Sequence, residues 1–194
     1  MGPRGRDQSF PRSRGELGLS TLAYHFLGGI LTHAEALTAL FTPTVNSFKR
    51  INAAPTVSGA TWSPNAISYG ANNRTHMVRI PEAGRFELRL MDGAANPYLL
   101  QAGVLAGGLD GITRQLDPGR RLDINMYEPG AAPADIPRLP LNLLDALRAF
   151  EISMPLRKAL GSDFVDSYVK LRMAQWSDYM RHLSEWEREH TLDA

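Results

Sequence analysis

Alternating apolar and polar residues at positions 74–90 predict a β-hairpin near the middle of the chain. Two alternating runs flank Pro81-Glu82-Ala83-Gly84, a typical turn sequence. Alternate residues of a strand share a face. One face of the hairpin collects Val78, Ile80, Phe86, Leu88 and Leu90, and the other collects Thr75, Met77, Arg79, Arg85, Glu87 and Arg89. We expect Val78, Ile80, Phe86 and Leu88 to be buried and the hairpin to be central in a small sheet.

Apolar residues recur at helical spacing on both sides of the hairpin. The predicted helices cover about residues 20–40, 97–112, 141–150, 154–160 and 162–190. Thr42-Pro43-Thr44 ends the first, Asn96 caps the second and Ser162 caps the last. Glycines inside the first two helices indicate close approach of another element, since each costs about 1 kcal/mol relative to alanine. The pattern predicts an α+β fold: a small, mostly antiparallel sheet backed by helices, with a helical C-terminal region.

The segments between these elements are rich in turn-forming residues. Residues 41–73 predict a long loop, of the kind that is usually functional, and residues 113–139 an extended surface connection. Residues 1–16 predict a disordered leader with four arginines and almost nothing to bury. The alternative is a basic arm that binds nucleic acid. We favour an unstructured end, because the segment lacks aromatic interleaving and a folded partner surface.

Length and composition limit the class of protein. The 194 residues suit one domain, and the 43% hydrophobic and 21% charged content is that of a globular chain. A net charge of +1 gives no global field that would mark a nucleic-acid or membrane-surface protein. The absence of cysteine excludes disulfides and thiolate chemistry and fits a cytoplasmic protein. His25, His33 and Glu35 interrupt the most apolar stretch, so we expect no membrane span.

The charged face of the hairpin is the strongest candidate for chemistry. Arg85, Glu87 and Arg89 occupy every second position of one run. Arg79 joins them from the other run, and Arg74 lies just upstream. A carboxylate among guanidiniums stays ionised and can hold a metal ion, while guanidiniums suit phosphate or a substrate carboxylate. The alternative is a solvated strand face with ordinary ion pairs, each worth about 0–1 kcal/mol, and the residues alone leave both interpretations open.

Several blocks of the sequence resemble one enzyme family. The blocks are LAYHFLGGILTHA (22–34), PTVNSFKR (43–50), NNRTHMVRIP (72–81), RFELR (85–89), ANPYLLQAGVLAGGLDGI (95–112) and the helical run 137–193. They resemble the C-terminal part of the glutamine synthetase catalytic domain. SGATWSPN (58–65) and RLDINMYE (121–128) are most similar to bacterial type III glutamate–ammonia ligases, a branch that includes γ-glutamylmethylamide synthetases. The resemblance implies that residues 17–194 form the C-terminal half of such a domain.

This resemblance implies a set of roles. Family members use ATP and Mg²⁺ or Mn²⁺ to phosphorylate the γ-carboxylate of glutamate, and ammonia or a small amine then displaces the phosphate. By position, Glu87 matches a metal-binding glutamate, and Arg50 and Arg89 match arginines at the glutamate site. Arg74 and Arg79 match catalytic arginines at the phosphate-transfer site. Arg79 and Arg85 are also matched to the nucleotide site.

The resemblance also implies what is missing. Family enzymes are about twice as long, and their N-terminal β-grasp domain and upstream metal-binding glutamates have no counterpart here. One carboxylate cannot hold two divalent cations, each of which needs several oxygen ligands. We therefore expect either half of a ligase, which another polypeptide completes with the N-terminal half, or an inactive remnant that at most binds nucleotide or a family oligomer. The expected protein partner is a complementing N-terminal half or a second copy of this chain in a homo-oligomer. Half of a γ-glutamylmethylamide synthetase is a further alternative.

A half-domain should also expose apolar surface that a full-length enzyme covers. We expect that surface on residues 48–62 and on the glycine-bearing faces of the helices at 20–40 and 97–112.

Overall fold

The computed structural model describes residues 16–51, 53, 63–126, 128 and 133–191. The predicted leader, apart from Glu16, lies outside these residues. The elements are η1 (Glu16–Gly18), α1 (Thr21–Thr32), α2 (Ala34–Phe41), α3 (Ser47–Ile51), β1 (Tyr69–Gly70), β2 (Val78–Glu82), β3 (Arg85–Leu88), α4 (Pro97–Arg114), α5 (Leu143–Ile152), α6 (Met154–Leu160), α7 (Ser162–Arg181) and α8 (Glu185–Thr191). The α+β prediction is confirmed. Among the described residues, no helix is both long and apolar enough to cross a bilayer.

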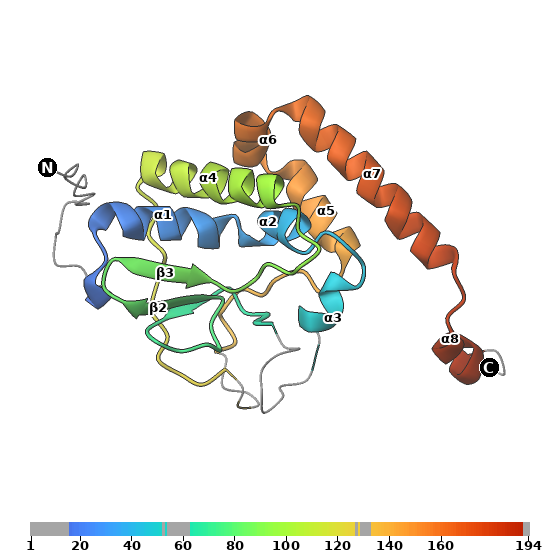
Figure 1. Ribbon diagram of the computed structural model, residues 1–194, viewed down its shortest axis with the longest axis horizontal. Coiled ribbons are helices and arrows are strands. Elements are labelled where there is room, and N and C mark those ends of the chain that lie inside the picture. The colour runs from blue at the N-terminus through green and yellow to red at the C-terminus, as the bar shows by residue number, and fades with distance from the viewer. Residues whose placement is uncertain (1–15, 52, 54–62, 127, 129–132, 192–194) are drawn as a thin grey trace, which may run out of the picture.

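The elements form layers. Helices α1 and α2 run end to end between the sheet on one side and α4 on the other (Figure 1). Every residue of α2 except Glu35 is buried, because α2 packs against both α4 and α5. Apolar residues on all sides of α2 are therefore what this position requires.

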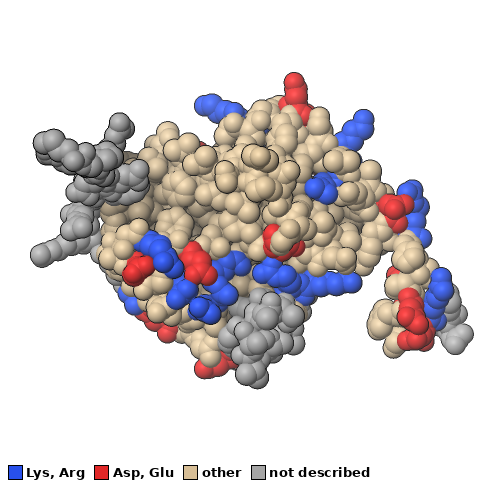
Figure 2. Space-filling model, viewed as in Figure 1, with Lys and Arg blue, Asp and Glu red and all other residues tan. Residues whose placement is uncertain are grey.

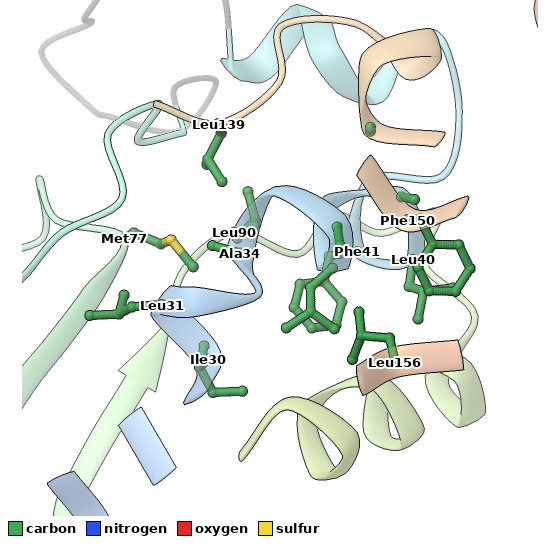
Figure 3. Packing of buried hydrophobic residues seen from close by; sticks show 14 of the residues in the cluster. Ile30, Leu31, Ala34, Leu40, Phe41, Met77, Leu90, Leu139, Phe150 and Leu156 are labelled. Atoms are coloured by element: carbon green, nitrogen blue, oxygen red, sulfur yellow. The ribbon is translucent and has the colours of Figure 1, made fainter. Parts of the chain in front are cut away.

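The core lies where these layers meet. Phe41 of α2, Phe150 of α5 and Leu156 of α6 are fully buried, and Figure 3 shows them on the side of the cluster away from the sheet. Met77 and Leu90 close the opposite side, next to Leu31 and Ala34 (Figure 3). One continuous apolar cluster thus holds the hairpin against the helices.

Within the described residues the sheet has three strands in the order β1-β2-β3. Strand β2 pairs antiparallel with β3, as the hairpin pattern predicts, and parallel with the two-residue β1, which the sequence pattern did not predict. The turn is tighter than expected, because Pro81 and Glu82 belong to β2 and only Ala83 and Gly84 turn the chain.

Burial of the hairpin follows the predicted alternation in β2 and does not follow it in β3 or before Val78. Val78 and Ile80 are buried as predicted, but Phe86 and Leu88 are half-buried. The assignment of Met77 (and of Thr75) to the polar face is wrong, because both are buried. The physical reason is that β2 begins at Val78, so the residues before it follow a loop and not a strand.

Two predicted helices are broken. The helix expected at 20–40 divides at His33, a buried residue whose Nε2 lies 2.7 Å from Oδ2 of Asp110. The helix expected to run to residue 190 stops at Arg181, and α8 is separate. Ser162 is the first residue of α7 and makes no side-chain cap, whereas Asn96 caps α4 as predicted.

The glycines in α1 and α4 bring the two helices into backbone contact. A Cβ built on Gly29 would overlap the carbonyl oxygen of Gly107 and lie 2.7 Å from Cα of Gly111. The predicted close approach is confirmed, so the expectation that these glycine-bearing faces are exposed is wrong. Phe48 is buried too, and residues 54–62 lie outside the described part. Exposed apolar surface instead lies on the other side of α4, where Leu105 and Leu109 are each 54% exposed.

Candidate functional site

The site is built on the register between β2 and β3. Arg79 pairs directly with Glu87 across the two strands, so their side chains share a face. Nη1 of Arg79 donates to Oε2 of Glu87 at 2.6 Å. Nε of Arg89 lies 3.4 Å from the other oxygen, Oε1. Each oxygen of this carboxylate therefore faces one guanidinium.

Arg79 is fixed from a second direction by Asn72. The Nε and Nη2 groups of Arg79 donate to Oδ1 of Asn72, at 2.8 and 2.5 Å. With the bond to Glu87, three N–H groups of this guanidinium are occupied, and its side chain is only 14% exposed. Arg79 is consequently held in one orientation. Sequence reasoning missed Asn72 because it placed this residue in the turn-rich loop at 41–73, although an amide close to an arginine-rich strand could have indicated this contact.

The arginines keep Glu87 ionised. Partial burial acts to raise the pKa of Glu87, but the hydrogen bond from Arg79 and the charges of Arg79, Arg89 and Arg74 together outweigh it. The pKa of this carboxyl therefore lies below its ordinary value, as the sequence predicted. Arg74 is exposed, and its charge is one of the three that lower the pKa of Glu87.

Two more predicted residues lie where the chain leaves β3. Nη1 of Arg50 donates to the carbonyl oxygen of Met91 at 3.1 Å, two residues beyond Arg89. Nη1 of Arg89 is buried and has no hydrogen-bond partner among the described residues. Figure 2 shows a group of basic side chains, with acidic ones among them, on the lower part of the molecule in that view, while other charged side chains project singly from its top and right edges.

Arg85 does not join this group. It forms an exposed ion pair with Glu82 across the turn, with Nη1 and Oε1 separated by 3.1 Å. The register is irregular between Arg79 and Glu82, so β3 does not continue the regular pairing up to Arg85. The structure thus collects Arg74, Arg79 and Arg89 around Glu87 and leaves Arg85 at the hairpin tip.

The described residues do not complete a metal site. No group of three or more His, Asp or Glu side chains in the described ranges is placed to hold a metal ion. Both oxygens of Glu87 face arginines, and a divalent cation such as Mg²⁺ needs several oxygen ligands. The donor set present here therefore does not fit a catalytic cation by itself.

Comparison with known proteins gives a consistent set of similarities. The family model for the glutamine synthetase catalytic domain matches residues 3–191. Glutamine synthetase of Rhizobium leguminosarum bv. phaseoli is 56% identical over 189 residues, which cover 97% of this chain and 43% of the relative. Glutamate–methylamine ligase of Methyloversatilis universalis is 49% identical over 180 residues, covering 91% of this chain and 40% of the relative.

Solved structures agree in fold. A GmaS–ADP complex superposes with a TM-score of 0.87 at 60% identity, over 94% of this chain and 42% of that one. GmaS without ligand gives a TM-score of 0.84 at 56% identity, over 94% and 41%. The chain thus spans about two fifths of the length of the curated relatives and solved chains that it matches.

Proposed function

Because this chain belongs to the glutamine synthetase family, we propose that it forms the C-terminal half of an ATP-dependent ligase acting on the γ-carboxylate of glutamate. The observation that carries the proposal is the cluster of Arg74, Arg79 and Arg89 around Glu87. Fixed guanidiniums recognise phosphate and carboxylate oxygens and stabilise the charge of a transferring phosphoryl group.

The reaction has two steps. The γ-phosphoryl group of ATP passes to an oxygen of the glutamate γ-carboxylate, and ADP leaves. The nitrogen of ammonia or a small amine then attacks the acyl carbon, loses a proton and expels inorganic phosphate. In this proposal Arg74 and Arg79 contact the phosphoryl group, and Arg50 and Arg89 bind the glutamate carboxylates. Arg79 and Arg85 contact the nucleotide.

Activity requires the part of the relatives' length that this sequence does not span. Glu87 is one metal ligand in the proposal, and the remaining ligands would come from a complementing N-terminal half. Strand β3 supports this, because it lies at an edge of the described sheet and an edge strand can accept a further strand. The proposed ligase works in the cytoplasm.

The acceptor amine is either ammonia or methylamine. The similarity to a glutamate–methylamine ligase and to GmaS chains supports methylamine, while the similarity to rhizobial glutamine synthetases supports ammonia. The remaining possibility is an inactive remnant that only binds nucleotide.

The test combines binding and complementation. Titration calorimetry of the purified chain with ATP should show weak binding, which Arg79→Ala weakens most and Arg85→Ala weakens less, because Arg79 is held at Glu87 while Arg85 is paired with Glu82 at the exposed hairpin tip. Product formation with either amine should be at background for the chain alone and should rise when a polypeptide carrying the relatives' N-terminal part is added. Glu87→Ala should abolish the restored activity. Strong product formation by the chain alone would refute the need for a second half. Failure of every complementation would support the alternative that the chain is an inactive remnant.

A further inference from the structure

The segment that carries Arg74 is tied to a distant part of the chain. Residues 71–76, which we term the Arg74 loop, connect β1 to β2 without regular structure of their own. The loop lies against residues 122–126, which also lack helix or strand. Two irregular segments some fifty residues apart therefore depend on side-chain hydrogen bonds to hold each other in place.

Thr75 is at the centre of these bonds. Its hydroxyl donates to Oδ1 of Asn73 at 2.8 Å and accepts the backbone N–H of Met126 at 3.0 Å. The backbone N–H of Thr75 donates to the same Asn73 oxygen at 2.9 Å. Nδ2 of Asn73 completes the tie by donating to the carbonyl oxygen of Ile124 at 2.8 Å. Thr75 is 5% exposed, so these bonds are shielded from competing water.

His76 anchors the next position. It is fully buried, and its Nδ1 lies 3.1 Å from Oγ of Ser68, the residue before β1. A Cβ on Gly70 would lie 2.6 Å from the His76 ring and 2.6 Å from the carbonyl oxygen of Leu122, so only glycine lets the three segments meet. Close packing therefore restrains the end of the loop, and hydrogen bonds restrain its middle.

Arg74 is exposed, although the loop that carries it is restrained. Asn72 before it holds Arg79, and Asn73 and Thr75 on either side bond to residues 124 and 126. The backbone on both sides of Arg74 is therefore fixed, while the guanidinium itself faces solvent and acts on Glu87. A long side chain presented from a fixed backbone loses less freedom on binding than one from a loose loop.

We propose that Thr75, together with Asn73, is a positioning residue that aims Arg74 at the phosphoryl group. This inference rests on the proposed role of Arg74, and neither Thr75 nor Asn73 need touch the substrate. A catalytic donor has to be held to within about 0.5 Å of its productive position. The bonds to Ile124 and Met126 supply that restraint, so residues 122–126 influence the site without facing it.

The test compares two substitutions of one hydroxyl. Thr75→Val keeps the shape but removes both hydroxyl bonds, whereas Thr75→Ser keeps the oxygen and is the matched control. In Arg74→Ala, the loss of one charged hydrogen bond should weaken ATP binding roughly tenfold. Thr75→Val should weaken ATP binding by about threefold or more, up to the effect of Arg74→Ala. Thr75→Ser should bind like the parent. In the Arg74→Ala background, Thr75→Val should add almost nothing, because it acts through Arg74.

A second measurement decides the matter even if the parent chain binds no ATP. Nuclear magnetic resonance of the Arg74 Nε–H group and exchange of the Met126 amide report the restraint directly. Thr75→Val should make both more mobile, and Thr75→Ser should not. Unchanged Arg74 mobility in Thr75→Val, or additive effects of the two substitutions on ATP binding, would overturn the inference. If Thr75→Val does not fold, Asn73→Ala takes its place, because it removes the bond to Ile124 and both bonds from Thr75 to Oδ1 of Asn73. Its readouts are the mobility of Arg74 and ATP binding, with the same expectations. Absent ATP binding with the expected mobility changes would refute only the proposed function.

Discussion

The backbone contact between α1 and α4 predicts a large effect from one added methyl group. In Gly29→Ala, the new Cβ would overlap the Gly107 carbonyl oxygen and lie 2.7 Å from Cα of Gly111, whereas ordinary contacts begin at 3.4 Å. The gap to Gly111 must therefore widen by about 0.7 Å, the difference of these two distances. Since both obstacles are backbone atoms, no rotamer change relieves them. A gap of 0.5–1 Å forfeits roughly a quarter to a half of the dispersion attraction across the interface.

Two opposing effects set the size of the stability loss in Gly29→Ala. Overpacking of a core costs about 1–3 kcal/mol, and backbone obstacles put this site at the upper end. The better helix propensity of alanine returns about 1 kcal/mol. We expect Gly29→Ala to lower the free energy of unfolding by about 2 kcal/mol, which in a chain of this size lowers Tm by roughly 4–8 °C.

Gly107→Ala is the matched control. Its Cβ would meet a side-chain methyl group of Leu37 at 3.1 Å and no backbone atom closer than 3.7 Å. We expect its free energy of unfolding to stay within about 1 kcal/mol of the parent, because a side chain can adjust where a backbone cannot. Both variants are compared by thermal and urea unfolding followed by circular dichroism. A Gly29→Ala chain as stable as the parent, or an equal loss in Gly107→Ala, would refute the reasoning.

Two further measurements test other parts of the structure. Oδ1 of Asn96 accepts the N–H groups of Tyr98 and Leu99, so Asn96→Ala should lower the free energy of unfolding by about 1 kcal/mol, and no change in urea unfolding would contradict the cap. Burial lowers the pKa of His76 in the folded chain, so below about pH 6.5 the unfolded chain binds a proton that the folded chain does not. As the pH is lowered below this value, the free energy of unfolding should decrease by up to about 1.4 kcal/mol per pH unit, and His76→Asn should remove this dependence. The same pH dependence in the parent and in His76→Asn would show that His76 is not its source.

Local patterns predicted much of the fold. The antiparallel hairpin at 78–88 and the cap at Asn96 depend on neighbouring residues only, and both are confirmed. The helix breaks at His33, whose side chain contacts Asp110, 77 residues away in the sequence. Strand β1 has two residues and pairs parallel, so no alternation could reveal it. Features decided by distant partners are those that the sequence pattern missed.

In the candidate site, too, local spacing predicted some features and missed others. That Glu87 lies among arginines followed from every-second-residue spacing, and the pairing of Arg79 with Glu87 confirms it. That Arg85 leaves the group depends on an irregular register near the turn, which spacing does not encode. The contact from Asn72 and the tie from Thr75 to Met126 arise from loop conformations, which have no period to detect.

The two halves of helix α7 differ in how strongly tertiary contacts stabilise them. Its buried residues, Val165, Tyr168 and Val169, all lie in its first half, and the last of its residues to pack against the core is Trp176. Beyond that point the helix projects from the body (Figure 1), and Tyr179 and Met180 are 48% and 60% exposed. Short helical segments without tertiary contacts are marginal in water. Amide hydrogens near residue 168 should therefore exchange only when the whole domain opens, while those of residues 177–181 should exchange by local fraying.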